Sequence, residues 1–301
     1  DVTFNEDDDR KRKNSAQNYS LINKMALNIL KNQPHKDKKA SIKRKRMKDK
    51  ETLLVAFSTQ KGGAGKTTLT VLMASYFHYV KGMNVAVIDC DYPQFSIVDL
   101  RARDMRNIER NPNLKKLAYE NFNNIQKRAY PIAESRPEEA IEKAKGFLAL
   151  PTPPDIIFFD LPGTVNNAGV IKTVATMDYV FCPIAADRVV MESSLKFATT
   201  LNDTMISTGQ SNIKGLYLLW NMVDGREKTD LYEIYERIAD ELGLKVMDTY
   251  LPDSKRFRKE GSETHGKAIF RSTMLPPDKT YIKGSNIDRL ADEIEKLINE
   301  K

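Results

Sequence analysis

A glycine-rich stretch at residues 59–68 holds the side chains whose chemistry is clearest. It reads Thr-Gln-Lys-Gly-Gly-Ala-Gly-Lys-Thr-Thr and separates an apolar run from a helical pattern. Glycines let successive backbone N–H groups face phosphate oxygens, and the dipole of a following helix attracts the same anion. We expect Lys66 to reach the β- and γ-phosphates of a nucleotide and the Thr67 hydroxyl to bind Mg²⁺. The predicted phosphate-lining residues are Gly62, Gly63, Ala64, Gly65, Lys66, Thr67 and Thr68.

Two carboxylates, Asp89 and Asp91, follow the next apolar run. Residues at i and i+2 of a strand point the same way, and in a parallel sheet the strand ends lie near the phosphates. Alone, such a pair is usually a solvated turn. When the pair follows a phosphate-binding loop after a single helix, it is a strong signal of a nucleotide site. We expect Asp89 to support the Mg²⁺ shell.

A third carboxylate, Asp160, ends the run Ile156-Ile-Phe-Phe and precedes Leu-Pro-Gly163. A carboxylate at that strand end can hold a Mg²⁺-bound water. Gly163 can pivot when the γ-phosphate leaves, which is the order–disorder switch of phosphate-loop proteins. The predicted metal ligands are therefore Thr67, Asp89 and Asp160.

Short apolar runs alternate with helical patterns from residue 51 onward, without an internal repeat. The predicted strands are 53–58, 84–89, 155–160, 179–183, 216–221 and 246–251. The predicted helices are 66–79, 191–208, 231–242 and 287–299, and residues 95–149 are mostly helical and charged. This alternation predicts an α/β fold of the P-loop NTPase type, a mostly parallel twisted sheet with helices on both faces.

Charge is divided unevenly along the 301 residues. The net charge is +7, but residues 1–50 contain 15 of the 48 basic and only 7 of the 41 acidic residues, so residues 51–301 are nearly neutral. We therefore expect two parts, a basic N-terminal segment (1–50) and a nucleotide-binding domain (51–301). DNA binding by the domain would need a local basic patch. Its two cysteines, Cys90 and Cys182, fit buried reduced thiols and no zinc or disulfide pattern.

The loop also departs from the ordinary Walker A pattern, because Gln60 stands where a glycine is usual and Lys61 follows it. Lys61-Gly-Gly-Ala-Gly-Lys-Thr-Thr68 resembles the deviant Walker A motif of the ParA/MinD family, within the SIMIBI class. The resemblance implies that Lys61 reaches across an ATP-bound homodimer to the partner's phosphates. It also implies that Asp91 positions the attacking water. The inserted Tyr92 leaves the placement of Gln94 open.

Further stretches resemble the same family. Asn221 of Trp220-Asn-Met-Val-Asp224 matches a family residue that contacts adenine, and Pro252 and Asp253 match a loop that flanks the base. The resemblance implies nonspecific DNA binding by a basic patch; a solvated helix face is the plainer alternative. The candidate DNA-binding residues are Lys255, Arg256, Arg258 and Lys259.

The phrases Phe57-Ser-Thr-Gln-Lys-Gly-Gly-Ala-Gly-Lys and Val87-Ile-Asp-Cys-Asp-Tyr-Pro-Gln resemble the ParA-like TraA proteins of Bacteroides conjugative transposons. Residues 1–46 resemble the C-terminal end of ISAs1-type transposases, which implies a fused or misread junction, with Met47 as a natural start. An ordinary basic tail that contacts DNA is the plainer alternative. The expected protein is a cytoplasmic, nucleoid-associated ATPase with ATP and Mg²⁺ as cofactors. Its expected partners are nonspecific DNA and a ParB-like or conjugation protein.

The sequence disfavours three other classes of protein. A MinD-like membrane ATPase needs a basic amphipathic C-terminal helix, whereas the helix 287–299 has an acidic polar face and predicts docking on the core. An electron carrier of the nitrogenase-reductase type needs cluster cysteines that are missing. A SIMIBI-class GTPase needs a lysine at Met222. The absence of a run of roughly 18 apolar residues argues against a membrane span.

Overall fold

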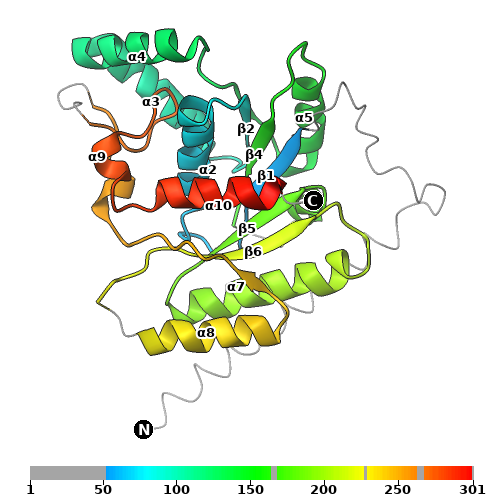
Figure 1. Cartoon of the computed structure of the whole chain (residues 1–301). Helices are drawn as coiled ribbons and strands as arrows, with labels where there is room; N and C mark the ends of the chain where they lie inside the picture. The colour runs from blue at the N-terminus through cyan, green and yellow to red at the C-terminus, as the bar shows by residue number, and fades with distance from the viewer. Residues whose placement is uncertain (1–51, 164–167, 227–228, 263–267, 300–301) are drawn as a thin grey trace.

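One parallel sheet organises the chain in the computed structural model, which describes residues 52–163, 168–226, 229–262 and 268–299. Its seven strands lie in the order β3-β2-β4-β1-β5-β6-β7 (Figure 1). They are β1 (Leu53–Phe57), β2 (Val85–Asp89), β3 (Ile132–Glu134), β4 (Ile156–Asp160), β5 (Tyr179–Ile184), β6 (Gly215–Trp220) and β7 (Lys245–Val246). The α/β fold predicted from the alternation is confirmed.

Helices cover both faces of this sheet. They are α2 (Lys66–Ser75), α3 (Ser96–Arg110), α4 (Pro112–Ile125), α5 (Ala140–Leu148), α6 (Ala168–Val174), α7 (Arg188–Leu201), α8 (Thr229–Glu241), α9 (Lys279–Ile282) and α10 (Ile287–Asn299). Short helical turns are η1 (Tyr76–Val80), η2 (Pro137–Glu139), η3 (Asn202–Ile206) and η4 (Lys255–Arg258). The helices predicted at 66–79 and 191–208 both end in a π-helical turn, η1 and η3.

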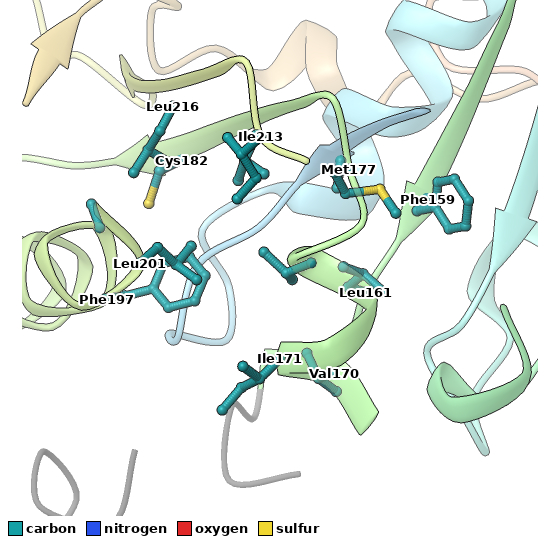
Figure 2. Close-up of a cluster of buried hydrophobic side chains, with 14 of the residues drawn as sticks. Phe159, Leu161, Val170, Ile171, Met177, Cys182, Phe197, Leu201, Ile213 and Leu216 are labelled. Atoms are coloured by element: carbon teal, nitrogen blue, oxygen red, sulfur yellow. The ribbon is translucent and has the colours of Figure 1, made fainter. Parts of the chain in front are cut away.

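Each strand contributes alternate residues to two cores, as the two-residue period of a strand requires. Val55 and Phe57 face the core formed with α2, η1, α3 and α10. Leu54 and Ala56 face the opposite core, formed with α5, α6 and α7. Figure 2 shows part of the second core, where Phe159 and Met177 lie near residues of α6 and Phe197 lies on α7. Both faces of the central strands are therefore buried, which explains their uninterrupted apolar runs.

Two parts of the sheet differ from the prediction. The region 95–149 was expected to be mostly helical, yet it contains the edge strand β3, paired with β2. The strand predicted at 246–251 is only the two-residue β7. Met247 and Leu251 are buried nonetheless. Their apolar character reflects packing of a loop against the core and not pairing in the sheet.

The last helix, α10, docks on the domain, which confirms that part of the prediction. Ile287, Leu290 and Ile294 are fully buried in the core with α2. Its acidic face also has partners within the domain, because the Lys81 ammonium donates to Asp292 and Glu295. Among the described residues, no helix combines the length and the apolar character needed to cross a bilayer.

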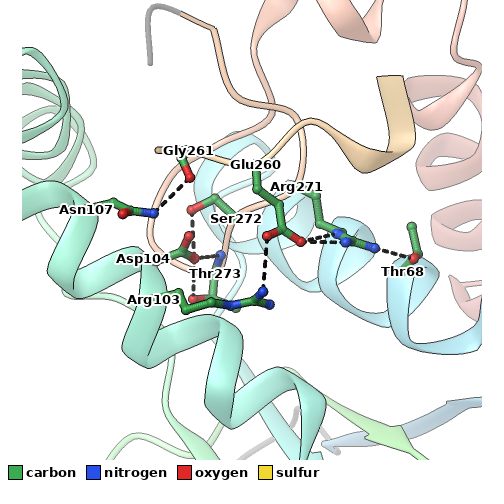
Figure 3. A network of polar contacts seen from close by, with 9 residues as sticks. All are labelled: Thr68, Arg103, Asp104, Asn107, Glu260, Gly261, Arg271, Ser272 and Thr273. Carbon is green, nitrogen blue, oxygen red and sulfur yellow. Dashed lines mark hydrogen bonds and ion pairs between the residues drawn. The ribbon is translucent and has the colours of Figure 1, made fainter. Parts of the chain in front are cut away.

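Residues 268–278, here called the arm, pack beside α3 and α4. Ile269 and Leu275 contact Leu114 of α4 in a small apolar cluster. Next to it, one oxygen of the buried Asp104 carboxylate accepts the Thr273 N–H at 2.6 Å and the Thr273 hydroxyl at 2.8 Å. The Ser272 hydroxyl donates to the same oxygen at 3.0 Å (Figure 3). Hydrogen bonds to a charged group typically stabilise a fold by roughly 1.5–3 kcal/mol each, so Asp104 fixes the arm to α3.

Candidate functional site

The glycine-rich loop lies between β1 and α2, at the carboxyl end of the central strands. Gly63 and Gly65 have φ values of +79° and +89°, which a residue with a Cβ adopts only with strain. A Cβ at Gly65 would also lie 2.6 Å from the Asn221 Nδ2 atom. Conformation and space therefore both require glycine at position 65, and the predicted loop between strand and helix is confirmed.

Asn221, directly after β6, supports this loop. Its side chain is 7% exposed, and its Nδ2 donates to the Ala64 carbonyl at 2.9 Å. Asn221, which the sequence predicts to lie near the nucleotide base, therefore supports the loop. Contact of Asn221 with adenine stays a prediction, but the side chain lies within bonding distance of the loop that would carry the phosphates.

Lys66 is the buried cation of the site. Its side chain is 8% exposed, and its Nζ donates to the Lys61 carbonyl at 3.2 Å. Burial lowers the pKa of Lys66, and the negative charges of Asp160 and Asp91 act against that shift. An ammonium kept out of water beside two carboxylates is well placed to bind phosphate, because its attraction to anions is weakly screened there.

Asp160 is a buried acidic residue of the site. It is fully buried, and among the described residues neither carboxylate oxygen has a hydrogen-bond partner of normal geometry. Burial raises the pKa of Asp160 to about 7, against the opposing effect of the nearby Thr67 hydroxyl. A buried carboxylate without partners is costly to maintain, and a bound cation is the usual compensation. Thr67 and Asp160 therefore fit a Mg²⁺ site.

Asp89 pairs with Asp160 across β2 and β4, so the strand register brings both carboxylates to one edge. Its oxygens, however, already accept backbone N–H groups. Oδ2 accepts those of Ile97 at 2.8 Å and Val98 at 3.1 Å, at the start of α3, and Oδ1 accepts that of Asp91 at 3.3 Å. Asp89 therefore holds the start of α3 and the turn at Asp91. Its predicted support of the metal shell stays a prediction.

Asp91 and Gly163 follow two neighbouring strands of the sheet, β2 and β4. Asp91 lies in the turn after β2, where its carbonyl accepts the N–H groups of Gln94 and Phe95. Gly163 lies against the loop, since a Cβ there would be 3.0 Å from Lys66 Nζ and 3.3 Å from the Gly62 nitrogen. A residue packed too closely against the lysine and the loop backbone to carry a Cβ is positioned to sense what the loop binds. The switch role of Gly163 remains a prediction.

The predicted base loop lies beside Asn221. Pro252 forms a bridge with Val223, and the Asp253 N–H donates to the Val223 carbonyl at 2.8 Å. The chain segments at 221–223 and 251–253, distant in sequence, are therefore neighbours. Pro252 is partly buried and Asp253 is exposed.

The predicted DNA-binding patch forms the turn η4 and the residue after it. Lys255, Arg258 and Lys259 are exposed there. Arg256 is instead committed to the fold, because its Nη1 donates to the Tyr281 carbonyl at 3.1 Å and to the Lys283 carbonyl at 2.6 Å. The structure thus brings three of the four predicted basic residues to the surface. His265 and Lys267, which follow this patch and also resemble the family in sequence, lie outside the described residues.

Two polar residues near the site were not predicted from the sequence. Arg271, in the arm, donates from Nη1 to the Thr68 hydroxyl at 2.8 Å. The two residues are 203 positions apart, so no local pattern connects them. Asp104 has a local signal, because it follows the buried Ile97 and Leu100 at helical spacing on one face of α3. A carboxylate at an apolar helix position indicates a specific buried partner.

Residues 55–266 match the family described as the CobQ/CobB/MinD/ParA nucleotide-binding domain. This match covers more than half of the chain and includes the loop, Asp160 and the segment after β6. The chain therefore belongs to the CobQ/CobB/MinD/ParA nucleotide-binding family.

Solved structures support the same fold. The chain is similar to the cell-division ATPase MinD of Pyrococcus furiosus (TM-score 0.53, 18% identity, covering 82% of this chain and 100% of that one). It is also similar to cobyrinic acid a,c-diamide synthase of Mycobacterium smegmatis with bound ATP analogue and magnesium (0.54, 17%, 83% and 96%). A third is a putative plasmid partition protein of Borrelia burgdorferi bound to AMPPNP (0.50, 17%, 82% and 100%). Comparison with curated protein sequences gives no match.

Proposed function

We propose that the chain is an ATP-hydrolysing switch whose ATP-bound form is a dimer that binds DNA nonspecifically. The observation that carries this proposal is the deviant phosphate loop. Lys66 is buried at its end and Lys61 lies on it. The buried Asp160 carboxylate, which has no hydrogen-bond partner of normal geometry in the part of the chain that the structure describes, lies beside it. Family membership supports nucleotide binding at this loop.

ATP and Mg²⁺ are the proposed ligands of the site. Similar structures hold AMPPNP and an ATP analogue with magnesium, which supports this choice. Thr67 and Asp160 would hold the metal, the latter directly or through a water. Bound there, Mg²⁺ would neutralise charge on the β- and γ-phosphates. Lys66 would supply a second positive charge from within the loop, so much of the catalytic effect would be electrostatic.

Two further residues have proposed roles, one in hydrolysis and one in completing the partner's site. Asp91 is proposed to position the attacking water, since it follows the strand next to β4 and its charge acts on Lys66. Lys61 is proposed to reach the partner's phosphates in the dimer. Its carbonyl is bonded to Lys66, which anchors its backbone in its own loop. Its ammonium would then complete the site of the other subunit.

DNA binding is assigned to the exposed residues Lys255, Arg258 and Lys259. Three cations near one another bind the phosphate backbone without reading sequence. A protein that holds DNA only with ATP would associate with the nucleoid and serve partition or conjugative transfer of a mobile element, with a ParB-like or conjugation protein as stimulating partner. Resemblance to the TraA proteins of conjugative transposons supports the second role. The match to a plasmid partition structure supports the first.

A membrane-positioning role of the MinD type is less well supported. The apolar face of α10 is buried against the domain and Lys81 pairs with its acidic face, so this helix is not available to insert into lipid. A GTPase is also disfavoured. Met222, which stands where a guanine-reading lysine would be, is exposed and carries no charge.

The dimer proposal predicts a specific effect of Lys61→Ala. We expect this variant to bind Mg²⁺·ATP within about threefold of wild type, because its own phosphate site is intact, but to remain a monomer. The molar mass from light scattering with ATP, ADP or GTP measures this directly. Wild type should double its mass with ATP alone. Lys143→Ala, on the exposed side of α5, is the charge-matched control and should behave as wild type. An ATP-dependent dimer of Lys61→Ala would contradict the assigned role.

A further inference from the structure

The arm delivers a cation to the start of α2 from the far end of the chain. Thr68 is the third residue of α2, in the first turn, where backbone N–H groups have no partner within the helix. The Arg271 guanidinium donates from Nη1 to the Thr68 hydroxyl oxygen at 2.8 Å. Figure 3 shows this contact between the arm and the helix. A positive charge thus lies one hydrogen bond from the end of the helix that attracts anions.

Arg271 is held in place from two directions. Its Nε and Nη2 both donate to one oxygen of Glu260, the former at 3.0 Å. The next two residues of the arm, Ser272 and Thr273, are bonded to the buried Asp104 of α3. Glu260 leaves its other oxygen 3.7 Å from Arg103. The guanidinium is therefore oriented before any ligand arrives, which lowers the entropic cost of using it.

The contact also fixes what the Thr68 hydroxyl can do. A hydroxyl has one proton to donate and two lone pairs, whereas an arginine only donates. With Arg271 on a lone pair, the hydroxyl proton must point elsewhere. Polarisation by the neighbouring cation makes that proton a better donor. The proton is then available to a phosphate oxygen at the helix start.

We propose that Arg271 is a nucleotide-positioning residue that orients and polarises the Thr68 hydroxyl toward a phosphate shared by ATP and ADP. The γ-phosphate end of the site is assigned to Lys66 and Asp160. Thr68 lies further along the helix and receives its partner from the arm. Removing Arg271 should thus weaken the binding of both nucleotides by a similar factor. This inference rests on nucleotide binding at the loop and is independent of dimer formation and of DNA.

Titration of the full-length chain with Mg²⁺·ATP and with Mg²⁺·ADP tests the proposal by calorimetry. We expect Arg271→Ala to raise Kd for both nucleotides by about tenfold, the effect of losing one charge-assisted contact. Thr68→Val should raise Kd to the same extent. The double variant should bind no more weakly than the weaker-binding single variant, because both substitutions act through one hydroxyl. Thr68→Ser, which keeps the hydroxyl, should bind as wild type.

Arg103→Ala is the matched control. It removes an equal charge from the other side of Glu260 without touching Thr68, and we expect Kd within about twofold of wild type. A folded Arg271→Ala protein that binds both nucleotides as tightly as wild type would overturn the proposal. The proposal would also be overturned if Kd of the double variant rose by the product of the two single increases, or if Arg103→Ala weakened nucleotide binding as much as Arg271→Ala. If wild type bound no nucleotide, the proposed function itself would be wrong. If wild type bound nucleotide and Arg271→Ala bound it equally well, only this inference would be wrong, so the two failures are distinguishable.

Discussion

Replacing Lys66 by alanine should abolish nucleotide binding. Lys66 lies at the end of the loop and is 8% exposed, and its positive charge acts on Asp160. Bonds from a cation to two phosphates contribute roughly 3 kcal/mol or more, so Kd for Mg²⁺·ATP should rise at least about 100-fold. Calorimetric titration of the variant with Mg²⁺·ATP measures the change.

Folding must be separated from binding in this experiment. Lys66→Met keeps most of the side-chain volume and should lose binding to the same extent, with an unchanged circular dichroism spectrum. Lys115→Ala removes an equal charge from an exposed position of α4 and should bind normally. A folded Lys66→Ala or Lys66→Met protein with near-normal Kd would show that the nucleotide binds elsewhere.

Replacing Asp91 by alanine should separate binding from hydrolysis. Asp91 lies in the turn after β2, where its carbonyl accepts the N–H groups of Gln94 and Phe95. Its backbone position therefore does not depend on the carboxylate. Loss of a residue that orients or accepts a proton from water typically slows a reaction by roughly 100-fold or more. We expect ATP to bind within about threefold of wild type while phosphate release nearly stops and the ATP-bound dimer persists.

Phosphate release under single-turnover conditions and the lifetime of the dimer are the two measurements. Glu109→Ala, on an exposed turn of α3, is the acidic control and should hydrolyse ATP at the wild-type rate. Full turnover by Asp91→Ala would remove it from the mechanism. The water would then have to be positioned by another group at the same edge of the sheet.

Local patterns predicted the parts of the fold that local forces determine. The central strands are apolar on both faces because both faces are buried, which a run such as Ile156-Ile-Phe-Phe shows directly. The strand β3 was missed because its three residues lie between charged helices at the sheet edge, where burial leaves little pattern. The strand β7 was predicted too long for the opposite reason. Met247 and Leu251 are buried in a loop, and burial alone does not distinguish a loop from a strand.

The site divides in the same way. Lys66, Thr67 and Asp160 were found because each stands at a fixed place relative to a strand or a helix start. Arg271 has no such place, since its contact with Thr68 arises only when the arm packs on α3. The role of Arg256 was also invisible in sequence. A run of basic residues does not show which one bonds to the carbonyls of Tyr281 and Lys283.

Nucleotide-dependent retention of DNA tests the central proposal most directly. The measurement compares binding of a labelled nonspecific duplex by the full chain and by a form that starts at Met47, with Mg²⁺·ATP, with Mg²⁺·ADP and without nucleotide. Because the body of the chain carries the proposed switch, both proteins should retain DNA with ATP and release it with ADP. Retention by the full chain alone, unchanged by nucleotide, would mean that the basic segment 1–46 binds DNA and would contradict the ATP-gated switch.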